Sequence, residues 1–276
     1  MWLAFEFPTA QAPNHRERLM KHEPPDGWNP LTDAQIKFSR AKILDALDRA
    51  PLECYYDIRG NFTGTSFVDL APNYAHKVTA TDLHAVAMLA VSIEPAATRR
   101  LLSETPVRKT MLEALGKVPE DVTLANASNA QLEAGWRFHG ATLAALSEPR
   151  ATNSKKWVTA AKLTARKRPL LIPVRDEKVT KSLGDVFWED GRAYWLVMRE
   201  LTSDPHVVAA ARSAVAAAKA RAASRVLETK FETNTLRLID VAVWMSAAGY
   251  ARTDSHKCAK ANRVAGRAWM DSGTGR

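Results

Sequence analysis

Cysteine is scarce in this chain, which has only Cys54 and Cys258 among its 276 residues. Two cysteines cannot form a framework of several disulfides or a four-cysteine zinc or iron–sulfur site. His256 lies close to the second cysteine, but no other cluster of metal ligands accompanies it. We therefore expect no metal and no other cofactor. So few cysteines also suit the reducing environment of the cytoplasm.

Long apolar runs are also absent. No segment approaches the ~20 consecutive apolar residues that a membrane-spanning helix needs. The first 20 residues mix acidic and basic side chains without a long apolar stretch, which is not the pattern of a signal peptide. We expect a cytoplasmic protein with no membrane partner. The apolar-looking segment 207–227 is interrupted by four basic side chains: Arg212, Lys219, Arg221 and Arg225.

Familiar nucleotide-binding and hydrolase motifs are missing as well. The chain has no phosphate-binding glycine loop, no nucleophile elbow and no His–Asp pairing typical of hydrolases. It has no internal repeat, which excludes a solenoid. The composition is otherwise that of a globular protein, with 46% hydrophobic and 25% charged residues and a length that suits one large domain or two small ones.

The charge is basic and unevenly distributed. Lys and Arg total 39 against 30 Asp and Glu, a formal net charge of +9. Residues 1–149 carry a net charge of −3 and residues 150–276 carry +12. This division favours an acidic polymer as partner, docked mostly on the second half. A basic surface that only aids solubility would give the same numbers.

Helical spacing dominates the chain from Thr81 onward, and one helix is expected before that. Thr32 and Gln35 form a capping-box pattern that opens a helix to about Arg49. The only strand-like region pairs Cys54–Ile58 with Phe62–Val68 across a short turn. We therefore expect a compact all-α fold with at most one small β-hairpin. Further helices are expected at about 81–92, 96–103, 106–115, 129–147, 155–167, 174–183, 188–201, 206–227 and 233–248.

Three regions are expected along the chain. Residues 1–30 are rich in proline and read as an extended lead-in, and residues 31–250 form the helical domain. Residues 251–276 are a basic tail that is either a loosely ordered arm or a frayed end. We expect a monomer.

The most informative segment is 153–184, with the sequence NSKKWVTAAKLTARKRPLLIPVRDEKVTKSLG. A polar loop leads into a helix from Trp157, which ends at the basic run Arg166–Arg168. The apolar run Leu170–Val174 follows, and a second helix begins around Asp176. A carboxylate is favoured there by the helix dipole. The turn before Trp157 leaves backbone N–H groups that could bind a phosphate.

This segment resembles the helix–hairpin–helix DNA glycosylases, the superfamily of endonuclease-III-like and alkyladenine glycosylases. The resemblance rests on Thr159-Ala160 at the start of a helix, on the apolar run Leu171–Val174, and on Asp176, eighteen residues beyond Val158. It implies a helix–hairpin–helix fold, DNA as partner and Asp176 as the catalytic carboxylate. Glu177 is the fallback carboxylate.

The whole chain also resembles an uncharacterised actinobacterial-type protein family, which supplies no activity. That resemblance covers most of residues 28–248. The residues that carry it are Tyr55-Tyr56-Asp57, Phe62-Thr63-Gly64, Trp157-Val158-Thr159-Ala160, Ala165-Arg166-Lys167-Arg168-Pro169, Ile172-Pro173-Val174 and Val241 to Met245.

Two departures from the glycosylase pattern bear on the chemistry. Where the superfamily has a glycine-rich hairpin, this chain has Ser154, Lys155 and Lys156, so lysine charge would replace part of the backbone grip on a phosphate. Val158 stands where bifunctional members have a Schiff-base lysine. The resemblance therefore implies a monofunctional enzyme that leaves an abasic site, in which Asp176 stabilises the positive charge that builds on deoxyribose as the base leaves.

The resemblance also implies contacts with DNA and with a flipped base. Each aromatic candidate could equally be core, and Asp57 could be only an ion-pair partner of Arg59. The candidate DNA-binding residues are Ser154, Lys155, Lys156, Thr159, Lys162, Arg166, Lys167, Arg168 and Arg175. The candidate pocket residues are Tyr55, Tyr56, Asp57 and Trp157, with Trp136 and Trp188 as further possible walls.

Alternatives to catalysis stay open. Asp176 could be only a first-turn acid that satisfies a helix end. The chain could then be a non-catalytic helix–hairpin–helix DNA-binding protein, or a remnant of that fold that contacts proteins. No residue names the base, although a modified base of phage DNA in a defence role is one option.

Overall fold

The computed structural model describes residues 21–147 and 156–250, and these residues confirm the expected all-α fold. They contain no strand, and their isolated β-bridge joins Asp57 to Thr229. The elements are α1 (Asp33–Arg49), α2 (Leu52–Tyr55), α3 (Ser66–Asp69), α4 (Ala80–Ala87), α5 (Pro95–Leu102), α6 (Pro106–Gly116), the 3₁₀ helix η1 (Leu124–Asn126), α7 (Asn129–Leu146), α8 (Lys156–Lys167), α9 (Glu177–Leu183), α10 (Asp185–Glu189), α11 (Gly191–Thr202), α12 (Pro205–Ser224) and α13 (Thr235–Ala247).

Many helices begin where the sequence provides a cap or a proline. The Thr32 hydroxyl accepts a hydrogen bond from the Gln35 backbone N–H at 3.3 Å, and the Gln35 side chain accepts one from the Thr32 N–H, so the expected capping box starts α1. Proline stands in the first turn of α5, α6 and α12, where a backbone N–H has no helical partner. The single helix expected at 188–201 is instead two helices, because Asp190 ends α10 and caps α11.

The β-hairpin that the sequence allowed at 54–68 does not form. The chain forms two short helices there, α2 and α3, joined by turns. All five consecutive side chains of residues 52–56 are buried, whereas a strand with one solvent face would alternate buried and exposed positions. The aromatic and β-branched residues of this segment have a local preference for a strand. Tertiary packing around the whole segment stabilises a compact helical turn instead.

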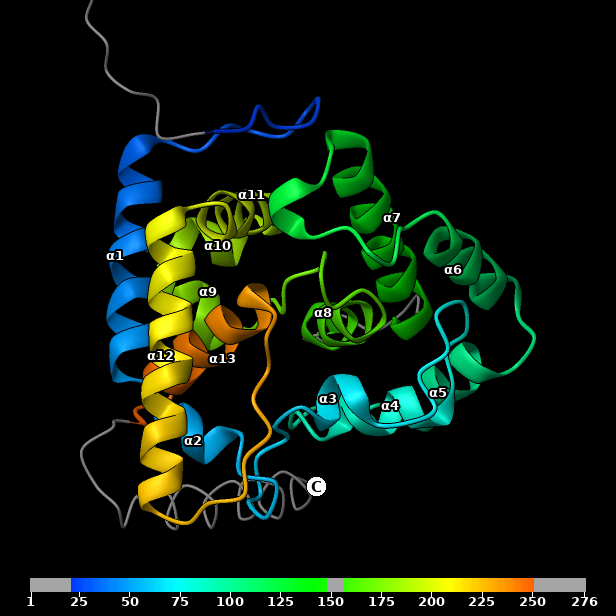
Figure 1. Ribbon diagram of the computed structural model, residues 1–276. Helices are drawn as coiled ribbons and strands as arrows, with labels where there is room; N and C mark the ends of the chain where they lie inside the picture. The colour runs from blue at the N-terminus through cyan, green and yellow to red at the C-terminus, as the bar shows by residue number, and fades with distance from the viewer. Residues whose placement is uncertain (1–20, 148–155, 251–276) are drawn as a thin grey trace, which may run out of the picture.

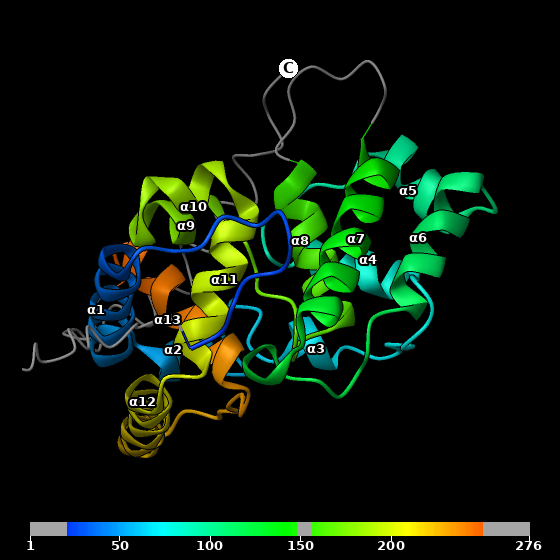
Figure 2. The same cartoon turned by 90° about the horizontal axis from the view of Figure 1, so that it is seen from above.

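The helices form two lobes (Figure 1). The first lobe contains α1, α2 and α9–α13, and in it α1 packs against α9, α11, α12 and α13. The second lobe contains α3–α8, and in it α7 packs against α5, α6 and α8 (Figure 2). The chain leaves the first lobe after α2 and returns after α8. Residues 168–176, which we call the crossing segment, therefore connect the second lobe to the first.

The end of the lead-in is extended along α11. Backbone N–H groups of Lys21 and His22 donate to the Glu200 carboxylate at 2.8 and 3.1 Å, and the Trp28 ring meets Trp136 edge-on at 5.7 Å. Residues 1–20 of the expected lead-in and the expected basic tail lie outside the described residues. None of the described helices combines the length and the apolar composition needed to cross a membrane.

Candidate functional site

Asp176 is the N-cap residue of α9, at the end of the crossing segment. Its backbone is extended, and its Oδ1 accepts a hydrogen bond from the Lys178 backbone N–H at 3.0 Å. The Asp176 carbonyl accepts the first helical bond, from the Thr180 N–H at 2.9 Å. The acid therefore has the helix-end role that the sequence left open. Its side chain keeps 15% of its surface exposed.

The second carboxylate oxygen of Asp176 faces a buried lysine of the other lobe. Lys162 on α8 places its Nζ 3.4 Å from Asp176 Oδ2 and donates to the Leu89 carbonyl at 2.8 Å. Burial lowers the pKa of the Lys162 ammonium, and the neighbouring Asp176 carboxylate partly opposes this shift. The pair joins the two lobes where the chain crosses between them.

A second carboxylate lies behind Asp176, in a group that we call the Asp240 cluster (Tyr194, Arg237 and Asp240). Asp240 on α13 accepts a hydrogen bond from the Val174 backbone N–H at 3.1 Å and pairs with Arg237 at 3.0 Å. The Tyr194 hydroxyl on α11 lies 3.3 Å from Asp240 Oδ1. Burial raises the pKa of Asp240 to about 6, while Arg237, the Val174 N–H and Tyr194 act in the opposite direction and Asp176 adds to the rise.

The basic run Arg166–Arg168 is internal, contrary to the expectation that it contacts DNA. Arg166 is fully buried, with Nε 2.7 Å from Asp82 Oδ1 and further bonds to the Phe67 and Leu70 carbonyls, both at 2.6 Å. Because these side chains complete the hydrogen bonds of irregular backbone, they are not available to a phosphate in this structure.

The other two side chains of this run have the same role. Lys167 Nζ binds the Asn73 side chain and the Tyr74 carbonyl at 2.7 and 2.6 Å. Arg168 donates to the carbonyls of Leu115, Val118 and Ala75 at 3.1, 2.8 and 2.9 Å. The run therefore attaches the irregular segments 67–75 and 115–118 to the end of α8.

The remaining candidates for DNA contact are also largely covered. Lys156 pairs with Glu94 at 2.6 Å, and its residue is 8% exposed. Thr159 is 5% exposed. Arg175, also 8% exposed, donates to the Phe187 carbonyl at 3.3 Å and to the Trp188 carbonyl. Ser154 and Lys155 lie outside the described residues.

The four candidate pocket residues fall into two separate groups. Tyr55 stacks on Phe62 at 5.6 Å, and Tyr56 meets Phe231 at 5.5 Å, in an aromatic core of the first lobe. Burial raises the pKa of both tyrosine hydroxyls well above their usual range. Asp57 forms the β-bridge with Thr229 and accepts a hydrogen bond from the Arg59 N–H at 3.2 Å. These three have the structural roles that the sequence allowed as alternatives.

Trp157 belongs to a different group, which we call the tryptophan face (Trp157, Arg175, Lys181 and Trp188). Trp157 at the start of α8 meets Trp188 on α10 edge-on at 5.1 Å, across the lobe boundary. The Arg175 guanidinium lies 4.3 Å from the Trp157 ring centre, and Lys181 Nζ lies 4.7 Å from that of Trp188. Both indoles are half-buried. Arg175 directly precedes Asp176, so this face adjoins the acid.

Sequence reasoning missed the Asp240 cluster and the Lys162–Asp176 pair. One signal was available for the cluster: Arg237 and Asp240 are the two charged residues of the mostly apolar α13, and they stand three residues apart and so share one face of the helix. No local pattern indicated Tyr194 or the distance from Lys162 to Asp176, because these contacts join elements that are distant in the sequence.

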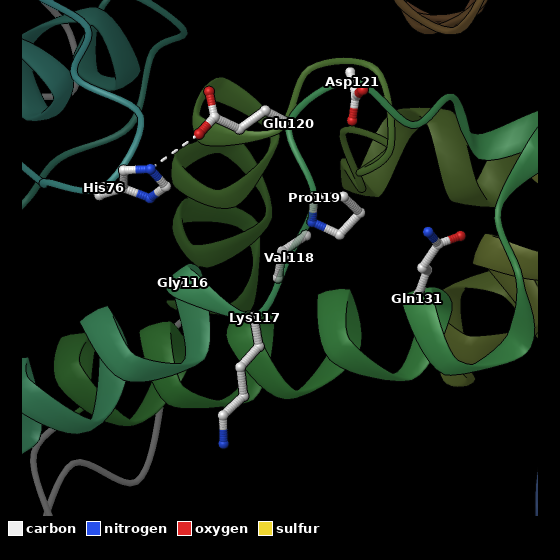
Figure 3. A pocket seen from close by; sticks show the side chains of 8 residues that line it. All are labelled: His76, Gly116, Lys117, Val118, Pro119, Glu120, Asp121 and Gln131. Atoms are coloured by element: carbon white, nitrogen blue, oxygen red, sulfur yellow. Dashed lines mark ion pairs between the residues drawn. The ribbon is translucent and has the colours of Figure 1, made fainter.

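A hollow of about 550 Å³ lies elsewhere, beside the loop after α6 (Figure 3). An ion pair between His76 and Glu120, 3.1 Å apart, stands on its rim. None of its lining residues belongs to the group around Asp176, and we assign it no role. It is lined by His76, Gly116, Lys117, Val118, Pro119, Glu120, Asp121 and Gln131.

Comparison with known proteins gives one match. No curated protein matches the chain, and no solved structure matches it. The model of a family of unknown function, DUF6308, matches residues 49–247, which include every helix from α2 to α13. The matched range contains the Lys162–Asp176 pair, the Asp240 cluster and the tryptophan face. This chain therefore belongs to the DUF6308 family of unknown function.

Proposed function

We propose that the protein is a DNA-binding, monofunctional DNA glycosylase, which excises a damaged or modified base and leaves an abasic site. The observation that carries this proposal is the setting of Asp176. Its carboxylate stands at a helix N-terminus on the boundary of two lobes, partly exposed, and within 3.4 Å of a buried lysine. The helix–hairpin–helix resemblance assigns the catalytic role to this same residue.

The chemistry needs a fixed negative charge beside the sugar. When the C1′–N bond breaks, the base leaves with the bonding electron pair and takes up a proton, and the deoxyribose becomes cationic. Asp176 would stabilise that cation electrostatically and orient the water that adds to C1′. This water loses one proton as it adds, which balances the proton that the base takes up. Lys162 and the Lys178 N–H hold the two carboxylate oxygens in place, so little reorganisation is needed as charge develops.

DNA contact is assigned to exposed groups beside Asp176 rather than to the buried basic run. Lys178 and Lys181 on α9, two and five residues after Asp176, are exposed cations suited to phosphates, and Lys181 also pairs with Glu177 at 3.0 Å. The half-buried rings of Trp157 and Trp188 offer faces and edges on which a base can stack. The proposal includes a site of action in the cytoplasm, and a modified base of phage DNA remains the candidate substrate for a defence role.

The competing function is a DNA-binding protein without catalysis. The observation that favours it is that both Asp176 oxygens already have partners, Lys178 N–H and Lys162. In that case the carboxylate serves α9 and the lobe boundary alone, and the exposed cations and tryptophans bind DNA that is left intact.

One experiment separates these functions. The full-length protein is incubated with duplexes that carry damaged, hypermodified or unmodified bases, and half of each sample is then treated with alkali. We expect strand breaks at one kind of modified base, only after alkali. Breaks without alkali would contradict a monofunctional enzyme. DNA binding with no abasic site on any duplex would favour the competing function, and no binding at low salt would exclude both.

A further inference from the structure

The backbone that leads into Asp176 is held by buried side chains of two first-lobe helices. We propose that Asp240 is a positioning residue for Asp176, acting through the crossing segment. This inference rests on the glycosylase function proposed above, because it concerns the same carboxylate. Asp240 is 6% exposed and lies on α13, far from Asp176 in the sequence.

Both backbone groups of Val174, two residues before Asp176, have buried partners. The Val174 N–H donates to Asp240 Oδ2 at 3.1 Å, and the Val174 carbonyl accepts a hydrogen bond from the Tyr194 hydroxyl at 3.1 Å. Arg237, the ion-pair partner of Asp240, donates to the Ile172 carbonyl. The Asp240 cluster thus fixes the direction in which the chain enters α9, and with it the Asp176 carboxylate.

The hold depends on the charge of Asp240. The charged or titratable groups that act on it are Arg237 on its own helix, Tyr194 on α11 and Asp176 at the start of α9, and Asp240 in turn acts on Tyr55 of α2. An ionised Asp240 attracts the Arg237 cation and accepts the Val174 N–H as a charged acceptor. Protonation removes the ion pair and weakens the hydrogen bond. Since burial raises the pKa of Asp240 to about 6, the contacts of Asp240 with Arg237 and with the Val174 N–H weaken as the pH falls through that value.

The test is the pH profile of base release in single turnovers, with the full-length protein and the duplex that gives alkali-dependent strand breaks in the preceding experiment. Wild type is expected to lose rate ~5-fold between pH 7 and pH 5, because about a tenth of Asp240 stays ionised at pH 5 and the protonated form keeps about a tenth of the rate. Asp240→Asn imitates the protonated acid. It should be ~10-fold slower at pH 7 and should lack this acid limb.

Tyr194→Phe is the second variant, and it keeps the proposal testable if Asp240→Asn does not fold. The Tyr194 hydrogen bond lowers the pKa of Asp240, so its removal should move the acid limb to higher pH. A purely structural role would slow the reaction without moving a midpoint. An acid limb that persists unchanged in Asp240→Asn, or one that stays in place in Tyr194→Phe, would overturn the inference.

A measurement without activity separates this inference from the proposed function. In the full-length protein with ¹³C-labelled aspartate, the Asp240 carboxyl resonance is identified by its loss in Asp240→Asn and followed with pH. The Asp176 carboxyl resonance and the Lys178 amide should report the same midpoint, near pH 6. If they are insensitive to it, Asp240 does not position Asp176. If they follow it while no base is released from any duplex, the positioning stands and the glycosylase function fails.

Discussion

Single residues in this protein have unexpected roles, because several basic side chains serve the backbone of the molecule itself. Arg166 pairs with Asp82 where both side chains are 0% exposed, and it also binds carbonyls of the segment before α4. A buried charge is tolerated only when it is paired and its donors are satisfied. Arg166 meets this condition, so this candidate for phosphate contact stabilises the fold instead.

Replacing Arg166 should destabilise the protein rather than only weaken DNA binding. Arg166→Met leaves the Asp82 carboxylate buried with one cation fewer and leaves two carbonyls without a donor, so we expect a loss of ~3–5 kcal/mol of unfolding free energy. Urea denaturation followed by circular dichroism measures it. Arg212→Met, at an exposed position of α12, is the matched control and should change stability by less than ~0.5 kcal/mol. Equal stability of the two variants would contradict the structural role.

At the scale of helices, local signals in the sequence predict position well. Thr32 with Gln35, and proline at the start of α5, α6 and α12, mark helix starts that the structure confirms. These signals succeed because a helix end needs its own partners within a few residues. The start of α9 follows the same rule, since Asp176 caps it, whereas the choice of Asp176 as the candidate acid came from the glycosylase resemblance.

What local signals miss is the partner chosen across the molecule. The aromatic segment 54–68 has strand propensity, yet packing on all sides makes it helical. The sequence suggests that Arg168 is a surface charge, yet its guanidinium donates to carbonyls of residues that lie fifty or more positions away in the sequence. Lys162 reads as one more cation for DNA, yet it pairs with Asp176. Each of these outcomes depends on tertiary contacts, which spacing along the chain does not encode.

The exposed lysines of α9 provide the test of the DNA surface. Lys178→Ala and Lys181→Ala should each weaken DNA binding and reduce the salt dependence of the binding constant by about one counterion, since each removes one phosphate contact. Fluorescence anisotropy over a range of salt concentrations measures both effects. Lys109→Ala, on the exposed side of α6, is the control. If it weakens binding as much as the two α9 variants, DNA does not dock beside Asp176.

For the whole molecule, the surplus of basic residues in the second half is only partly on the surface. Residues 150–276 carry +12, but Lys156, Lys162, Arg175 and the run Arg166–Arg168 are buried and paired with internal groups. The charge division therefore reflects, in part, how α8 and the crossing segment connect the two lobes. The proposal that DNA is the partner therefore depends on fewer and different basic residues, the exposed Lys178 and Lys181 next to the tryptophan face.

The dependence of stability on pH should reflect His139 on α7. Its ring donates to the Trp157 carbonyl and stacks on Trp136, and burial lowers its pKa to about 4. Since an unfolded histidine titrates near 6.5, the unfolded state binds more protons between these values, and stability is lost as the pH falls through them. His139 alone should lower the free energy of unfolding by about 2 kcal/mol when the pH falls from 7 to 5.

Asp240 acts in the opposite direction over part of this range. Its pKa of about 6 in the folded protein lies above that of an unfolded aspartate, so its contribution to stability grows as the pH falls, by about 1 kcal/mol at pH 5. His139→Asn removes the contribution of His139. The free energy of unfolding of this variant should therefore change by about 2 kcal/mol more favourably than that of wild type when the pH falls from 7 to 5. Urea denaturation at the two pH values measures this, with His84→Asn as the exposed control. An unchanged difference would show that His139 is not buried in the neutral form.

The central claim, that Asp176 is the catalytic carboxylate, is tested most directly by its rate of base release. Asp204 is the matched control, because it is also an N-cap aspartate with a cation beside it, Arg40 at 2.9 Å. Both Asp176→Asn and Asp204→Asn keep a capping side chain. We predict that Asp176→Asn lowers the single-turnover rate ~100-fold or more, while Asp204→Asn stays near wild type. An Asp176→Asn protein that releases the base at the wild-type rate would contradict the account.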